Sequence, residues 1–147
     1  MAIDLDLFSG SNYRSTIVQY CNNLGWHIND INDRRTIIKF NMDSGNTQTL
    51  FIIRYDNTLE FSCPSGLKFD STGDCPAWLS AALLCKNREY KVGFWCIEGI
   101  GDKQALSIMH NAEISLIDVN YFRRVINQLV KECDDLEQTV ARALRGY

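Results

Sequence analysis

Apolar positions recur along the 147-residue chain with two different periods, and the change from one to the other predicts its elements. Spacings of three and four residues are typical of amphipathic helices. They occur over Asn12–Leu24, in a segment that begins near Pro76, and after Asp118. The last stripe is the longest, because it runs from Phe122 to Leu144 over about seven turns. We therefore predict three helices, and we expect the second to be well buried because its apolar face is broad.

Between these helices the pattern changes to β-branched, aromatic and alternating segments, which are typical of strands. The alternation is clearest in Thr58–Cys63, where Leu59, Phe61 and Cys63 occupy every second position. Short turns separate neighbouring segments, which favours hairpins and an antiparallel sheet. The predicted strands are Thr36–Met42, Gln48–Tyr55, Thr58–Cys63, Val92–Ile97 and Ala105–Met109, with Trp26–Ile28 as a short edge strand.

The order of the main elements is thus α-β-β-β-α-β-β-α. We predict an α+β fold in which the helices pack mainly on one face of an antiparallel sheet. Residues 1–147 contain no linker, repeat or low-complexity segment, and this length is typical of one domain with its own core. We therefore expect a single domain.

The charge of the chain is mildly acidic, with 15 Lys and Arg against 18 Asp and Glu, a net charge of −3 and a pI near 5.3. This balance argues against nucleic-acid binding, which favours a basic face. Met1–Leu7 lacks the features of a signal peptide, and no apolar run approaches the roughly 20 residues that span a bilayer. We expect a cytoplasmic protein without membrane contact.

The six cysteines form no C-x-x-C pair and are too few for a disulfide scaffold. We expect reduced thiols that are mostly buried, as the apolar helical positions of Cys21 and Cys133 indicate.

Few residues are candidates for catalysis, because the chain has only two histidines. Cys96 and His110 would make a nucleophile and base if the hairpin brought them together. Nothing activates this thiol, however, and its apolar neighbours indicate a buried strand. No histidine spacing suits a metal, and Asp134, Asp135 and Glu137 are typical of a solvent-exposed helix face. We predict no enzyme activity, no catalytic or metal site and no cofactor.

The order of elements resembles the type III secretion chaperone-like fold, including the YbjN-like family, most closely in the second half of the chain. There an apolar helix ends at Asn87, a glycine–aromatic strand follows at Gly93–Ile97, and a long helix bears Phe122 and Leu129. The resemblance implies a small, usually dimeric, non-enzymatic protein that binds a partner polypeptide, often along an extended path. An assembly or shell protein is one client that it suggests.

Two apolar regions are candidates for a partner or dimer interface. In the first, Trp78 and Trp95 either pack together in the core or contribute to a homodimer, since Val92–Ile97 is apolar on both faces. In the second, Thr47–Tyr55 either accepts a client strand along an exposed edge or is blunted by nearby basic residues. The candidate interface residues are Trp78, Leu83, Phe94, Trp95, Ile97, Phe51, Ile53 and Tyr55, and the candidate blunting residues are Lys39 and Arg54.

Three functions follow from this pattern. The first is a protein-binding module or assembly chaperone that holds a segment of a client protein as a homodimer. The alternative is a small-molecule-binding regulatory module with its ligand between sheet and helix. The third, an enzyme that uses Cys96 or His110, is the least consistent with the sequence.

Overall fold

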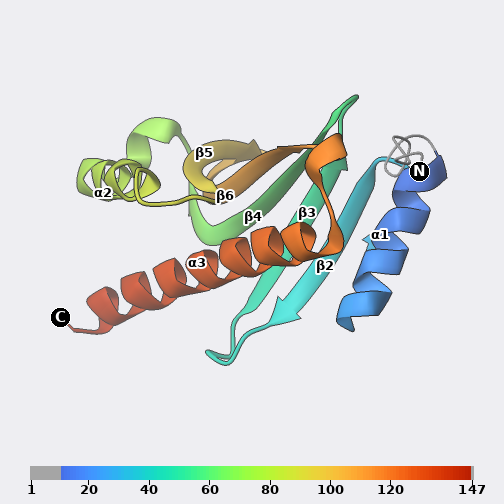
Figure 1. The fold of residues 1–147 in the computed structure, drawn as a ribbon. Coiled ribbons are helices and arrows are strands. Elements are labelled where there is room, and N and C mark those ends of the chain that lie inside the picture. Colours follow the sequence, from blue (N-terminus) through green and yellow to red (C-terminus); the bar gives the residue numbers. More distant parts are fainter. Residues whose placement is uncertain (1–10, 147) are drawn as a thin grey trace.

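The computed structural model describes residues 11–146, which form three helices and a six-stranded antiparallel sheet (Figure 1). This confirms the predicted α+β fold. The helices are α1 (Ser11–Leu24), α2 (Ala77–Asn87) and α3 (Val119–Arg145). The strands are β1 (Asp30–Ile31), β2 (Arg35–Asn41), β3 (Thr47–Arg54), β4 (Thr58–Phe69), β5 (Phe94–Ile100) and β6 (Lys103–Glu113). Two 3-10 turns, η1 (Thr72–Asp74) and η2 (Ile114–Leu116), precede α2 and α3.

The sheet has the strand order β1-β2-β3-β4-β6-β5, and its register assigns each side chain to one of two faces. Thr36, Ile52, Phe61 and His110 are successive partners across four strands and therefore share one face. The adjacent row lies on the opposite face and crosses five strands through Ile37, Phe51, Ser62, Met109 and Phe94.

All three helices lie on the face that carries Phe61. From α1, the Tyr13 hydroxyl lies 2.7 Å from Thr36 Oγ1 and donates to the carbonyl of Ile52. From α3, the fully buried Phe122 ring packs edge-on against Phe61, with 5.9 Å between ring centroids. Helix α2 lies beside β5, at the end of the sheet opposite α1 (Figure 1). The opposite face of the sheet carries no helix of the described chain, as the sequence predicts.

Several predicted strand boundaries are wrong. The first short strand is Asp30–Ile31, because the Trp26 ring packs instead against the aromatic rings of Phe40 and Phe122. Strand β4 continues past Pro64 to Phe69, since a shift in its pairing with β6 accommodates a residue without an N–H donor. Strand β6 is regular through Glu113, which matches the longer β4.

The prediction that α2 is well buried is also wrong. Leu79 and Leu83 are buried, but Trp78 and Leu84 are 69% and 67% exposed. Only one side of this helix contacts the sheet. Its predicted cap, Asp74, accepts hydrogen bonds from Ser71 within η1 instead, and Pro76 occupies the N-cap position.

Helix α3 begins as predicted, with the Asp118 carboxylate accepting the Tyr121 backbone N–H at 2.7 Å. The predicted apolar stripe of α3 does not remain buried to its end, and Leu144 is 75% exposed. The reason is that the last turns of the helix extend beyond the sheet (Figure 1). The side chain of Ser11, the predicted cap of α1, is not among those that the structure describes. The amino-terminal residues 1–7 lie outside the described residues.

Candidate protein-binding surface

Strand β5 forms one edge of the sheet, and Asn87 at the end of α2 occupies part of that edge. The Trp95 backbone N–H donates to Asn87 Oδ1 at 2.6 Å, and Asn87 Nδ2 donates to the Trp95 carbonyl at 3.1 Å. The side-chain amide therefore takes the place of a neighbouring strand. Because backbone direction alternates along a strand, Ile97 and Gly99 also direct their N–H and C=O groups away from β6. Within the described chain no hydrogen bond reaches these groups on that side.

A small apolar cavity of about 210 Å³ separates α2 from the sheet. Leu83 and Leu84 line it from the helix, and Trp95, Ile97 and Leu106 line it from β5 and β6. These strand residues lie on the helix-covered face, so the cavity is a packing gap at the margin of the core.

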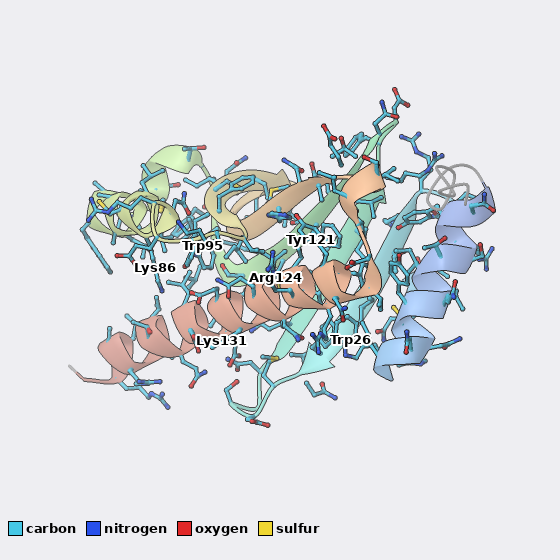
Figure 2. The ribbon with its side chains drawn as sticks, in the orientation of Figure 1. Trp26, Lys86, Trp95, Tyr121, Arg124 and Lys131 are labelled. Carbon is cyan, nitrogen blue, oxygen red and sulfur yellow. The ribbon has the colours of Figure 1, made fainter. Side chains whose placement is uncertain are left out.

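Two hydrogen bonds fix the Trp95 ring against α3. The indole Nε1–H donates to the Tyr90 hydroxyl at 3.0 Å, and that hydroxyl donates to Glu132 Oε2 at 2.9 Å. Lys86 of α2 pairs with the same carboxylate at 3.3 Å, so Glu132 links α2 to α3 (Figure 2). Burial is the largest of the effects that raise the pKa of Tyr90, which therefore stays protonated as the donor.

One side of α2 is apolar and uncovered. Trp78, Ala81, Leu84 and Cys85 are exposed, and their spacing of three and four residues places them together on the helix. We refer to these four residues as the α2 surface.

The sheet face without helices forms a second apolar surface. Ile37, Phe51 and Met109 are half-buried, and Phe94 is 37% exposed in the same row. We call this row, together with Ile53, the open sheet face.

The open sheet face has an acidic margin. Glu98 Oε1 accepts the Ser62 and Ser107 hydroxyls at 2.9 and 2.6 Å. Burial, with a smaller effect from Glu98, raises the pKa of Glu60. Burial also raises the pKa of Cys96 to about 11, with Glu98 and Glu60 adding to the effect. Its thiol is therefore protonated near neutral pH and weakly nucleophilic.

The predicted interface residues fall into two groups. Leu83, Trp95 and Ile97 come together at the cavity between α2 and β5, and Trp78 lies on the exposed side of α2. The others lie on or beside the open sheet face: Phe51, Ile53, Phe94 and, just after β3, Tyr55. Trp78 and Trp95 do not share a core position, since Trp95 is buried and Trp78 is largely exposed.

The prediction of an accessible edge at Thr47–Tyr55 is wrong over Phe51–Arg54, where β3 pairs with β4 as well as with β2. Thr47–Leu50 pair with β2 alone. Lys39 lies on the paired β2 side and Arg54 pairs with Leu59 of β4, so neither residue blunts a free edge of β3.

The catalytic pair considered from sequence does not form. His110 shares the helix-covered face with Phe61, whereas Cys96 is the register partner of Ser107 on the opposite face.

The six cysteines are all free thiols. Four of them are buried, Cys96 is half-buried and Cys85 is exposed, which agrees with the expectation of mostly buried thiols. Residues 11–146 contain no group of three or more His, Cys, Asp or Glu that could hold a metal. Within the same residues, no helix combines the length and the apolar character needed to cross a membrane.

A buried polar cluster was missed by the sequence analysis. Asp134 is only 5% exposed, and its carboxylate accepts hydrogen bonds from Ser44, Gln48 and Gln138. Glu137 accepts from the Gly66 N–H and from Gln48. The expectation of a solvated face is therefore wrong for Asp134. One signal in the sequence could have indicated this cluster. Gln48 is polar, but it alternates with Leu50 and Ile52 and therefore shares their buried face of the strand.

This arrangement is the type III secretion chaperone-like fold, an antiparallel sheet covered by three helices on one face. The order of its main elements along the chain is the one that the sequence predicts. The solved structures that share it include YbjN from E. coli, described as a proposed transcription regulator. That structure has a TM-score of 0.59 at 16% identity, over 90% of this chain and 93% of the other. A chain of the HopA1–SchA chaperone–effector complex has a TM-score of 0.60 at 11% identity, over 91% and 97%. No protein-family model and no curated protein sequence matches the chain. The comparisons therefore establish the fold.

Proposed function

We propose that the chain is a non-enzymatic, chaperone-like protein-binding module that dimerises through α2 and β5 and holds a segment of a client protein. The observation that carries this proposal is the α2 surface. Two large apolar side chains, Trp78 and Leu84, are about two-thirds exposed on one helix beside a sheet edge. Contiguous exposed apolar surface of this kind marks interaction sites.

A second copy of the chain is the partner that best fits α2 and β5. A two-fold axis beside β5 would place this strand antiparallel to its own copy, so that the outward groups of Ile97 and Gly99 find partners. The same axis would bring the two α2 surfaces together and cover Trp78 and Leu84.

The open sheet face suits the client. Its row crosses five strands and is apolar on four of them, with Ser62 on β4, and it lies on the side that the three helices leave uncovered. The HopA1–SchA structure, which has a similar fold, is a chaperone–effector complex, and this supports a protein client for the present chain. We also propose a cytoplasmic location, since the six cysteines are free thiols.

A small-molecule site between sheet and helix is less well supported. The cavity between α2 and the sheet has a volume of about 210 Å³. Ligand pockets usually enclose about 300–1,000 Å³. A surface for a polypeptide therefore accounts for this region better.

The dimer is tested by Leu84→Arg, which places a charge on the α2 surface without disturbing the core. We expect light scattering at micromolar concentration to give twice 16.8 kDa for the unmodified chain and 16.8 kDa for the variant. The control is Leu116→Arg, because Leu116 is 70% exposed on η2, away from α2. The control should remain dimeric. A mass near 16.8 kDa for the unmodified chain, or a dimeric Leu84→Arg variant, would contradict the proposal.

A further inference from the structure

A groove lined mainly by charged and polar residues lies between the first turns of α3 and the loop that joins α2 to β5. Its volume is about 900 Å³. The side chains that matter for its chemistry are Lys91, Tyr121, Arg123, Arg124, Asn127 and Lys131. Figure 2 labels Tyr121, Arg124 and Lys131. No residue of the α2 surface or of the open sheet face lines it.

The groove is basic although the whole chain is acidic. Lys131 pairs with Asp135 at 3.0 Å, but Lys91, Arg123 and Arg124 make no ion pair within residues 11–146. Of the two carboxylates at the groove, Asp118 is already engaged as the N-cap of α3, and the other is Glu89. Three cations without a carboxylate partner therefore face the same groove in a chain of net charge −3. Such a local excess attracts negative charge.

Tyr121 is oriented so that its hydroxyl can act as a donor. The Gly93 N–H donates to His110 Nδ1 at 3.1 Å, which makes that nitrogen an acceptor. Burial, together with the positive charge of Arg124, lowers the pKa of His110, so the ring is neutral at pH 7 and carries its proton on Nε2. This Nε2–H donates to the Tyr121 hydroxyl at 2.6 Å. The hydroxyl proton of Tyr121 is then left for another acceptor.

Arg124 lies over the Tyr121 ring. Its guanidinium carbon lies 5.7 Å from the centroid of the Tyr121 ring, a cation–π geometry. The ring is thus fixed by His110 at one end and covered by a cation, while the guanidinium N–H groups remain unpaired. Planar guanidinium groups bind carboxylates through paired N–H donors.

We propose that this groove binds an acidic segment of a partner polypeptide, with Lys91, Arg123 and Arg124 pairing with its carboxylates and Tyr121 donating a hydrogen bond. A polypeptide fits better than a nucleic acid, because three unpaired cations beside two carboxylates do not make the continuous basic stripe that tracks a phosphate backbone. The groove is separate from the α2 surface, so this site does not depend on the proposed dimer.

The probe is a fluorescently labelled peptide that alternates glutamate and serine, and the measurement is fluorescence anisotropy at low salt. We expect the unmodified chain to bind this peptide and to bind it more weakly as salt rises. Replacing both groove arginines by Arg123→Gln and Arg124→Gln should weaken binding about tenfold or more. The matched control carries Arg142→Gln and Arg145→Gln near the end of the same helix, outside the groove, and should bind as the unmodified chain does.

Four results would overturn the assignment. They are no measurable binding of the glutamate peptide, equal binding of a peptide with glutamine in place of glutamate, equal weakening by the groove and control substitutions, and tighter binding of single-stranded oligothymidine than of the peptide. The Leu84→Arg variant should bind the peptide normally. An unmodified chain that binds the peptide but is monomeric would contradict the dimer alone, and a dimeric chain that does not bind the peptide would contradict the groove site alone. Circular dichroism of each variant confirms that it is folded.

Discussion

Asp134 illustrates how a single buried carboxylate joins distant parts of this chain. Its oxygens accept hydrogen bonds from Ser44 and Gln48 of the β2–β3 hairpin at 2.8 and 3.2 Å, and from Gln138 one turn further along α3 at 2.8 Å. A buried charge is tolerated when several donors satisfy it. The spacing of apolar residues along α3 cannot reveal this role, because Gln48 lies 86 positions away in sequence.

The substitution Asp134→Ala should lower the free energy of unfolding by about 1–3 kcal/mol, because it leaves buried donors without their acceptor. Urea unfolding followed by circular dichroism measures the change. The matched control is Asp135→Ala, which removes only a partly exposed pair with Lys131 and should cost about 0.5 kcal/mol or less. Equal losses in the two variants would show that the hairpin contact contributes little.

At the scale of the elements, the edge strand β5 and the helix α2 behave as one unit. Asn87 closes the edge at Trp95, and Tyr90 holds the Trp95 ring from the following loop. The sequence predicts both elements, and it also places Asn87 at the end of the helix. It does not show that the asparagine amide replaces a strand, because that contact depends on how the loop returns the chain to the sheet.

Asn87→Ala should destabilise the chain by about 1–3 kcal/mol, since two hydrogen bonds to the Trp95 backbone are lost. The Trp95 amide should also exchange with deuterium faster than in the unmodified chain. Nuclear magnetic resonance measures both the exchange and the retention of the fold. Arg88→Ala, at the exposed neighbouring position, is the control and should leave the Trp95 amide unchanged. An unaltered exchange rate in Asn87→Ala would exclude this bracing role.

The two errors about α2 and β3 have different causes. The broad apolar face of α2 led to the prediction that the helix is well buried. Apolar composition does not say which apolar residues contact the sheet, and Trp78 and Leu84 are largely exposed in the structure. The position of β3 was accessible to reasoning, because the middle strand of a three-stranded meander has a neighbour on each side.

At the scale of the whole molecule, one face of the sheet builds the core, and the other face carries no helix of the described residues. Tyr13, Phe61 and Phe122 are fully buried between the helices and the sheet, which accounts for the agreement between the predicted and observed fold class. Periodicity specifies such a core well, because each element contributes one apolar stripe. It does not specify the α2 surface, the open sheet face or the basic groove, which arise where residues from separate elements meet.

Hydrogen exchange read by mass spectrometry at two protein concentrations locates the dimer contact that we propose. If α2 and β5 form that contact, segments 77–87 and 94–100 should exchange more slowly in the concentrated sample, whereas the exposed end of α3 should exchange equally in both. Equal exchange of segments 77–87 and 94–100 at both concentrations, with the sample dimeric by mass, would place the contact elsewhere and contradict the role assigned to the α2 surface.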